Sequence, residues 1–284
     1  MIFVLGVRGR FGQALCRALP ADEVTAVDRS VYADWWRDDA AAEVIRYFES
    51  CGRSAPGSVV VVAAGVLDPA QPPAEHWQVN VELPSRVIQG ACAAGLRVVT
   101  LGTVMERLVE HQNPYIAAKA QLGRFAALCS EAGDAVMHLQ IHTLYGGGRP
   151  ASFMFLGQIC AALSEGRPFE MSPGTQLREY HHVDDDVAAL LQLIRAETAG
   201  VVGLSHGAAV TLRDLATHVF SAVGREDLLH IGARPEPADD NYATVLPRPE
   251  VLDGIDFRAT LPGVSTYVQS VVANDHFPAP QKPK

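Results

Sequence analysis

The chain opens with a short apolar run that leads directly into a turn with three glycines. Residues 1–5 read MIFVL, and Gly6, Gly9 and Gly12 follow, with the apolar spacing of an amphipathic helix over residues 10–19. Glycines at these positions let the backbone turn tightly and approach a pyrophosphate, whose charge then lies at the helix N-terminus. Although the spacing differs from the commoner GxGxxG, the flanking strand and helix favour a dinucleotide site over a purely structural turn. The residues expected to contact the cofactor are Gly6, Arg8, Gly9, Arg10, Phe11 and Gly12.

Beyond this turn, apolar strands alternate with helical stretches. The expected strands are 1–5, 23–28, 58–64, 96–101 and 136–144, and the expected helices are 10–19, 40–50, 76–94 and 115–132. Continuous valine-rich strands joined by helical crossovers are typical of a parallel sheet covered on both faces. The sequence therefore predicts an α/β fold: a doubly wound parallel sheet of the Rossmann type with a smaller C-terminal α/β lobe.

The alternation of strands and helices changes after Tyr145. Residues 146–150 read GGGRP, and a proline-rich stretch covers residues 234–249. Helices are expected over 183–196 and 211–223. We therefore predict a dinucleotide-binding domain over 1–145, with 183–205 returning to it, and a substrate-binding lobe from 146–182 and 206–276. The tail, 277–284, is expected to be frayed.

Tyr115 and Lys119 stand one helical turn apart, so their side chains project from the same face. A phenol has a pKa of about 10 and is a poor base at neutral pH. A neighbouring ammonium, together with the positive charge of an oxidised nicotinamide, stabilises the phenolate. A lone YxxxK motif is often a surface pair, but behind a glycine turn it indicates proton transfer coupled to hydride transfer.

Such a site also needs a hydroxyl that bonds the substrate oxygen, near the end of the preceding strand. Thr103 is the first choice, and Thr100 is the reserve. For both residues the alternative is an ordinary role in a strand or a helix cap.

Asp28 stands at the end of the second expected strand. Its carboxylate can accept a hydrogen bond from the adenosine ribose, which favours NAD. Arg8 and Arg29 can instead pair with a 2′-phosphate, so NADP stays open. For Arg29, a solvated loop charge is an equally good interpretation.

Composition excludes several function classes. The net charge is −9, with 32 acidic against 23 basic side chains and no Lys/Arg cluster, which disfavours nucleic acid or an anionic membrane as a partner. The longest apolar stretch, Val59–Leu67, is far shorter than the ~20 residues of a membrane helix. Five cysteines without a CxxC pair suit reduced thiols. Because Met1 already begins the first strand, we expect no signal peptide and a cytoplasmic protein.

These motifs occur in an order that resembles a known family. The matching positions are Gly6, Gly9, Gly12, Asp28, Ala63, Ala64, Gly65, Asn80, Tyr115, Lys119, residues 144–146 (LYG) and residues 178–185 (REYHHVDD). Together they are similar to the extended short-chain dehydrogenase/reductases, in the nucleotide-sugar epimerase/dehydratase branch.

The resemblance implies roles for individual residues. Ala63, Ala64 and Gly65 would pass beneath the cofactor ribose, and Asn80 would lie in the central helix near the sheet. Thr103, Tyr115 and Lys119 would be catalytic. Arg178 would bind the nucleotide diphosphate, for which a bidentate guanidinium is suited, the alternative being a salt bridge to Glu179 or Asp184. The residues expected to contact substrate are His142, Thr143 and Arg178, although His142 also suits a core position.

Two departures from the family pattern restrict the reaction. Sugar 4,6-dehydratases carry an Asp-Glu pair after the catalytic threonine, but here Val104 and Met105 follow, which disfavours dehydration. Gln140 and Thr143 stand where the RxxNVYG pattern of the family usually has its arginine and asparagine. His181, His182 and the following aspartates suit a strand running into an acidic helix start, so no metal is expected.

The expected function is an NAD(P)-dependent oxidoreductase of a nucleotide-linked sugar, with 4-keto-deoxysugar reduction ahead of epimerisation through a transient ketone and tightly bound NAD. A non-catalytic redox sensor, or a reductase of a small aldehyde or ketone, are the alternatives. The family resemblance also implies a homodimer.

Overall fold

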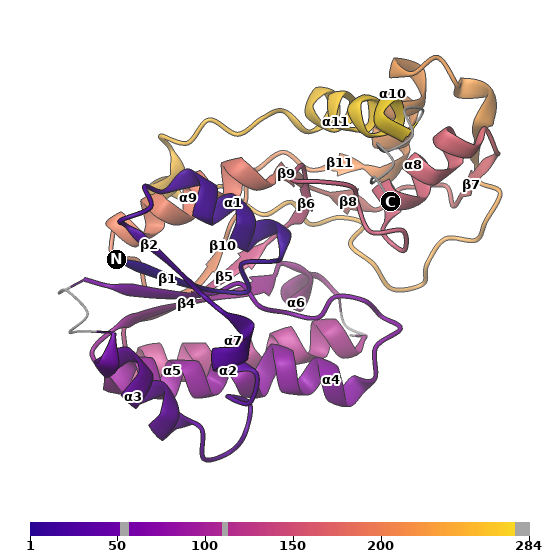
Figure 1. The fold of residues 1–284 in the computed structure, drawn as a ribbon. Helices are drawn as coiled ribbons and strands as arrows, with labels where there is room; N and C mark the ends of the chain where they lie inside the picture. Colours follow the sequence, from indigo (N-terminus) through magenta and orange to yellow (C-terminus); the bar gives the residue numbers. More distant parts are fainter. Residues whose placement is uncertain (52–56, 110–112, 276–284) are drawn as a thin grey trace, which may run out of the picture. The chain divides into compact units, whose positions relative to one another are not determined.

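In the computed structural model, which describes residues 1–51, 57–109 and 113–275, a six-stranded parallel sheet lies at the centre of the first of two units (Figure 1). Its strands are β1 (Ile2–Leu5), β2 (Val24–Val27), β3 (Val59–Val62), β4 (Arg97–Thr103), β5 (Val136–Ile141) and β10 (Gly200–Gly203). They lie in the order β10-β5-β4-β3-β1-β2. After β2 the chain therefore crosses to the other side of β1 and adds its remaining strands there, all parallel. This arrangement confirms the predicted doubly wound parallel sheet.

Helices cover both faces of this sheet. Figure 1 shows α1 (Arg10–Ala18) and α9 (Val183–Arg195) on one face, with α3 (Ala41–Ser50), α5 (Leu83–Ala93) and α7 (Pro114–Glu131) on the other. All four valines of β3 are buried, as expected for a strand whose two faces are both packed. The shorter helices of this unit are α2 (Arg29–Tyr32), α4 (Pro73–Trp77), α6 (Met105–Leu108) and the 3-10 turn η3 (Glu250–Leu252).

The long helix expected over 76–94 exists, but it contains a π-helical turn, η1 (Gln78–Glu82), between α4 and α5. The Leu83 amide donates to the Gln78 carbonyl, five residues back. Pro84 explains the wider turn, because a proline ring inside an α-helix clashes with the carbonyl four residues earlier. The π turn places Asn80 in the interior, where it is fully buried.

The strand expected over 136–144 is wrong as a single element. β5 ends at Ile141, and a separate strand, β6 (Thr143–Tyr145), begins after His142. β5 pairs with β4 and β10 in the first unit, whereas β6 pairs in parallel with β9 (Tyr180–His182) in the second. The chain therefore changes sheets at His142, a change that continuous apolar character does not reveal.

The second unit contains residues 143–182, 206–247 and the described residues from 256. Besides β6 and β9, its short strands are β7 (Phe169–Met171), β8 (Leu177–Arg178), β11 (Val210–Thr211) and β12 (Leu229–Ile231). Its helices are α8 (Phe155–Glu165), α10 (Leu212–Ala222), α11 (Thr260–Asp275) and the 3-10 turn η2 (Glu226–Leu228). The three long helices pack around their own apolar core, which includes Ile159, Val219 and Val264. The first unit comprises residues 1–142, 183–205 and 248–255; the binding roles expected of the two parts stay predictions.

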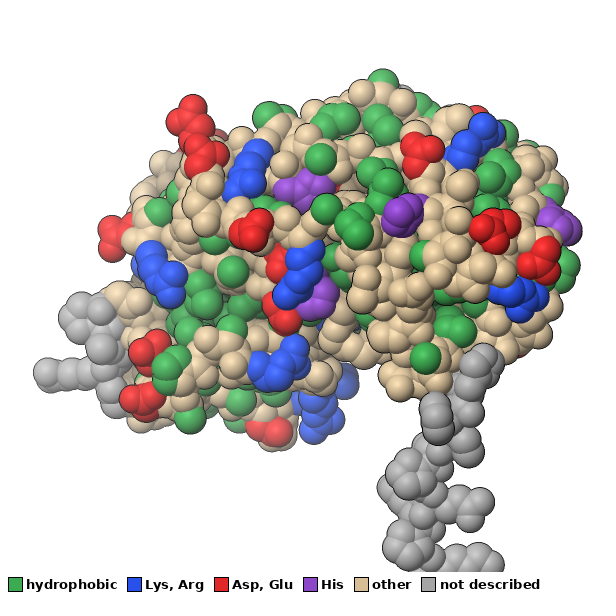
Figure 2. All heavy atoms as spheres, turned by 90° about the horizontal axis from the view of Figure 1, so that it is seen from above, with side chains coloured by type: hydrophobic (Ala, Val, Ile, Leu, Met, Phe, Trp, Pro, Cys, Tyr) green, Lys and Arg blue, Asp and Glu red, His purple; other side chains and the backbone are tan. Residues whose placement is uncertain are grey.

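All five cysteines are free. Among the described residues, no helix combines the length and apolar character that crossing a membrane requires. On the face in Figure 2, basic side chains are scattered among acidic ones and form no single patch. The tail expected to be frayed begins just beyond the described residues.

Candidate active site

The glycine turn forms a tight backbone cradle between β1 and α1. Gly6 has a φ of +89°, and a Cβ there would lie 2.3 Å from the Ala64 amide nitrogen. A Cβ at Gly12 would lie 2.4 Å from the Gly6 carbonyl oxygen. A side chain at either position would therefore clash with neighbouring backbone atoms. No side chain caps α1, and its first turn holds no acidic residue, so the positive end of the helix dipole is available to an anion.

The other turn residues have different roles. Phe11 is buried, Arg8 is exposed and Arg10 is partly buried at the start of α1. The Tyr32 hydroxyl accepts a hydrogen bond of 3.0 Å from the Gly6 amide and thereby supports the turn from α2. Sequence reasoning missed Tyr32, because nothing local links it to a glycine 26 residues earlier.

Asp28 directly follows β2 and caps α2. Its carboxylate accepts hydrogen bonds from the Ser30 amide (2.9 Å) and the Ser30 hydroxyl (2.7 Å). The hydroxyl and then the amide of Ser30, with a smaller effect of the Arg8 charge, lower the pKa of Asp28. Asp28 and Arg29 are both exposed, so each is accessible to a ligand at this end of the sheet.

The loop after β3 lies between the glycine turn and α7. Ala63 and Ala64 lie against Gly6 through their backbone. Asn80 accepts a hydrogen bond from the Val66 amide (3.1 Å) and donates one to the Val66 carbonyl (2.8 Å). A Cβ at Gly65 would lie 3.1 Å from the Asn80 side-chain oxygen and 3.6 Å from Lys119 Nζ. Asn80 therefore fixes the loop that separates the proposed cofactor turn from the lysine.

Tyr115 and Lys119 lie in the first turns of α7. Asn113 caps this helix by accepting from the Ile116 amide at 2.9 Å, and Pro114 occupies its first position. Lys119 is buried, and its Nζ donates to the Leu101 carbonyl at 2.8 Å. The same Nζ lies 6.0 Å from the centroid of the Tyr115 ring.

The surroundings of this pair set its protonation. Burial lowers the pKa of Lys119 to about 8, although the nearby Glu106 carboxylate acts in the opposite direction. Burial, and to a smaller extent the Glu106 charge, raise the pKa of Tyr115 above its ordinary value. At neutral pH the pair is therefore a phenol beside an ammonium, which is a proton-donating arrangement.

One sequence signal for Lys119 was missed. The chain has only three lysines, at 119, 282 and 284, so its other cationic side chains before the tail are arginines. A lysine ammonium is compact and changes its pKa when buried, whereas an arginine stays protonated. A single lysine among arginines therefore indicates that position 119 needs a property that arginine lacks.

The two candidate hydroxyls have different environments. Thr103 ends β4, and its Oγ1 accepts from the Met105 amide at 3.3 Å. Thr100 is fully buried, and its Oγ1 lies 2.8 Å from Nδ1 of His138. Because Thr100 is bonded within the core, the geometry favours Thr103 as the hydroxyl available to a substrate.

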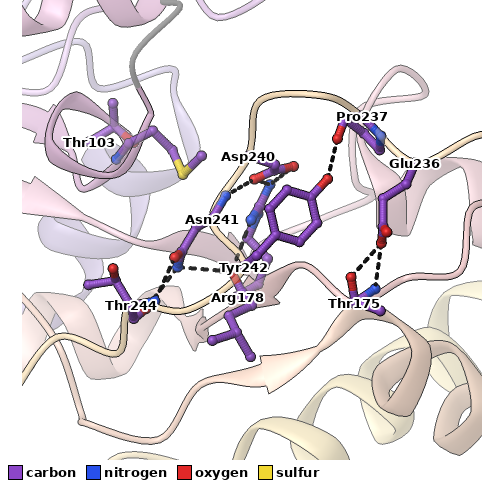
Figure 3. Close-up of polar contacts among 11 residues, drawn as sticks. Thr103, Thr175, Arg178, Glu236, Pro237, Asp240, Asn241, Tyr242 and Thr244 are labelled. Atoms are coloured by element: carbon purple, nitrogen blue, oxygen red, sulfur yellow. Dashed lines mark hydrogen bonds and ion pairs between the residues drawn. The ribbon is translucent and has the colours of Figure 1, made fainter.

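The predicted substrate residues Thr143 and Arg178 lie in the second unit, whereas His142 is the last residue before it. Thr143 begins β6 opposite Tyr180. Figure 3 shows Arg178 against Asp240: Nη2 lies 2.6 Å from one carboxylate oxygen and 2.7 Å from the other. The alternative of a salt bridge to Glu179 or Asp184 is therefore wrong, since a residue far along the chain is the partner.

Comparisons with known proteins bear on the family and the fold of this chain. The model of the NAD dependent epimerase/dehydratase family matches residues 2–204, and no curated protein matches the chain. MoeE5 in complex with UDP-glucose and NAD has a TM-score of 0.74 at 22% identity, covering 97% of this chain and 99% of that one.

Two further solved structures have the same fold. The dTDP-glucose 4,6-dehydratase DesIV from Streptomyces venezuelae, with NAD and TYD bound, has a TM-score of 0.74 at 19% identity, covering 99% of both chains. The UDP-N-acetylglucosamine 4-epimerase from Bacillus cereus has a TM-score of 0.73 at 15% identity, covering 97% of this chain and 99% of that one. Because the family model spans well over half of the sequence and includes the glycine turn and the Tyr115/Lys119 pair, this chain belongs to the NAD dependent epimerase/dehydratase family.

Proposed function

We propose that this protein is an NAD(P)-dependent oxidoreductase of a nucleotide-linked sugar and that it reduces a 4-keto-deoxysugar. The observation that carries the proposal is the Tyr115/Lys119 pair in the first turns of α7, where the buried Lys119 ammonium bonds the Leu101 carbonyl and burial raises the pKa of Tyr115. A carbonyl reductase needs a proton donor at the start of its reaction, whereas an epimerase that first oxidises an alcohol needs a proton acceptor.

The glycine turn fits a dinucleotide. Without side chains at Gly6 and Gly12 the backbone can turn closely in front of α1, so that a pyrophosphate can lie at the helix N-terminus. Asp28 would accept from the adenosine ribose, and we therefore favour NAD over NADP. When bound, the reduced nicotinamide supplies the hydride that adds to the keto carbon.

The chain's own residues would supply the rest of the reaction. The Tyr115 hydroxyl donates its proton to the former keto oxygen, and Thr103 holds that oxygen by a hydrogen bond. The Lys119 ammonium stabilises the phenolate that results. Val104 and Met105, the two residues directly after Thr103, carry no acid or base for the elimination of water.

Support for a nucleotide-sugar substrate comes from the names of the similar structures, which hold UDP-glucose or are described as acting on dTDP-glucose or UDP-N-acetylglucosamine. Arg178 would bind the diphosphate of such a substrate. The protein's homodimeric state and its cytoplasmic location stay predictions.

The test is Tyr115→Phe, assayed with NAD(P)H and a panel of UDP-, dTDP-, CDP- and GDP-linked 4-keto sugars. Turnover should fall by about 100-fold or more, because the proton donor is lost, while cofactor affinity stays within about twofold. Tyr47→Phe is the matched control: it removes a hydroxyl on α3, where the ring packs against Trp35. Retained turnover in Tyr115→Phe would refute the catalytic assignment.

Cofactor stoichiometry separates the remaining functions. A reductase consumes one external NAD(P)H per product, whereas an epimerase keeps its NAD bound and consumes none. Cofactor binding without any sugar conversion would favour the redox sensor instead.

A further inference from the structure

A buried polar cluster lies directly behind the end of β4. We name it the Glu106 cluster; its members are Thr100, Thr103, Glu106, His138 and Gln140. Glu106 is its centre: one carboxylate oxygen accepts from the Thr103 amide at 2.6 Å, and the other accepts from Gln140 Nε2 at 2.9 Å. Nε2 of His138 lies 3.2 Å from the carboxylate, and its Nδ1 lies 2.8 Å from Thr100 Oγ1.

Two glycines make room for this cluster. A Cβ at Gly102 on β4 would lie 2.1 Å from His138 Nε2 and 2.4 Å from a Glu106 oxygen. A Cβ at Gly123 on α7 would lie 2.8 Å from the other Glu106 oxygen. Any side chain at either glycine would displace the carboxylate, so strand and helix are both shaped around it.

The Glu106 carboxylate is ionised although it is almost completely buried. Its side chain is 3% exposed. Burial acts to raise the pKa of Glu106, but the hydrogen bond and charge of His138, with the bonds from the Thr103 amide and Gln140, lower it below the ordinary value. Burying a charge is costly, and its retention here points to a use.

That charge stands beside the catalytic pair. Glu106 bonds the Thr103 amide, and Lys119 bonds the Leu101 carbonyl two residues earlier on β4. Gly123, against which the carboxylate packs, lies one helical turn beyond Lys119 on α7. The described groups that face Glu106 include His138 and Gln140 from β5, Thr103 from β4, and Tyr115 and Lys119 from α7 by electrostatic interaction.

We propose that Glu106 is a positioning residue for the reaction: it fixes the Thr103 backbone, and its buried negative charge holds Lys119 as an ammonium and Tyr115 as a phenol. This inference rests on the proposed role of those two residues. The proposal also explains why residue 140 departs from the family pattern, because the side-chain amide of Gln140 donates to the Glu106 carboxylate.

The first test needs no substrate. Lys119 is the only lysine outside positions 282 and 284, so Lys282→Arg/Lys284→Arg leaves one lysine side chain to observe. NMR of this protein with ¹³C-labelled lysine follows the Cε shift of Lys119 as pH changes. In the parent protein the midpoint should lie near pH 8. In Glu106→Gln it should move to lower pH by on the order of one unit, because the charge that favours the ammonium is gone.

Controls separate charge from structure. Glu131→Gln removes an equal charge from the exposed end of α7 and should leave the Lys119 midpoint unchanged. If Glu106→Gln does not fold, Glu106→Asp carries the test: its shorter side chain withdraws the carboxylate from the Thr103 amide, and the midpoint should fall by a smaller amount. An unmoved midpoint in a folded Glu106 variant overturns the proposal.

The second test uses the pH profile of kcat/KM for reduction. Glu106→Gln should shift the alkaline limb to lower pH, and Glu106→Gln/Gln140→Glu, which returns one carboxylate to the cluster, should restore it at least halfway. A purely structural role would lower kcat/KM equally at every pH and leave the limb in place, which would overturn the proposal. If no sugar is reduced but the Lys119 midpoint still shifts, the proposed function fails while the electrostatic role of Glu106 stands.

Discussion

Asp240 forms an ion pair with Arg178, whose guanidinium would bind the substrate diphosphate in the proposed function. Both carboxylate oxygens lie within 2.7 Å of Nη2 of Arg178, and the two side chains are 18% and 13% exposed. Exposed ion pairs contribute about 0–1 kcal/mol, and removing one partner of a fully buried pair costs about 3–5 kcal/mol. For this partly buried pair we expect a contribution of about 1–2 kcal/mol.

The substitution Asp240→Asn tests this competition. Asparagine has nearly the same shape, and its side-chain oxygen can still accept from the Asn241 amide, a bond of 2.6 Å in this structure. A diphosphate must displace Asp240 to reach Arg178, so loss of the carboxylate should tighten nucleotide-sugar binding by about tenfold, the equivalent of about 1.4 kcal/mol. The free protein should unfold at a lower temperature, because its ion pair is gone.

Calorimetric titration with nucleotide sugars and thermal unfolding measure the two effects. Asp239→Asn is the control, because it removes the same charge from the neighbouring residue and accounts for long-range electrostatics. Arg178→Ala should abolish the gain. Binding by Asp240→Asn that equals or falls below that of Asp239→Asn would refute the competition and show that Asp240 helps to orient Arg178 instead.

Three further predictions concern the first unit. Thr103→Val should lower kcat for reduction by about tenfold or more, whereas Thr100→Val should cost about 1–2 kcal/mol of stability through its lost bond to His138 and change kcat little; the reverse pattern in kinetics and denaturant unfolding would exchange their roles. Gly6→Ala should weaken NAD(P)H binding at least about tenfold, since its Cβ would meet Ala64. Gly95→Ala is the control, because Gly95 has a similar positive φ but no neighbour within 4 Å. An equal loss of affinity in both variants would contradict the role of the Gly6 turn in cofactor binding. For the free enzyme, kcat/KM for reduction should fall above pH about 8, where Lys119 loses its proton; a profile that is flat to pH 10 would contradict the role of the ammonium.

The first unit was largely predictable because its signals are local. The glycine turn, the valine run of β3 and the Tyr115/Lys119 spacing each lie within a few residues. Thr103 was the first choice because it stands near the end of its strand, but the burial pattern does not separate it from Thr100, because β4 is buried on both faces. The deciding contact is His138, 38 residues beyond Thr100.

The second unit was less predictable because packing decides its elements. α11 contains Pro262, Gly263 and several β-branched residues, a poor composition for a helix, and it is held by Val264 and Val268 in the core. Arg178 pairs with a residue 62 positions away. The two nearer acids, which were the alternative to diphosphate binding, pair elsewhere: Asp184 with Arg17 in the first unit and Glu179 with His181 in the second.

The π-helical turn at Gln78–Glu82 interrupts an otherwise regular helix between α4 and α5. It accommodates one more residue than an α-helical turn does, so the helix on either side of it keeps its own packing face. Deleting a single residue from this turn would restore α-helical spacing and leave α4 and α5 close to their present packing faces, so the part that changes is the turn itself, which holds Asn80 in the interior. Asn80 would then lose Val66, and the loop between the glycine cradle and Lys119 would lose its anchor. A one-residue deletion in a helix would thus loosen the loop that lies between the glycine cradle and Lys119.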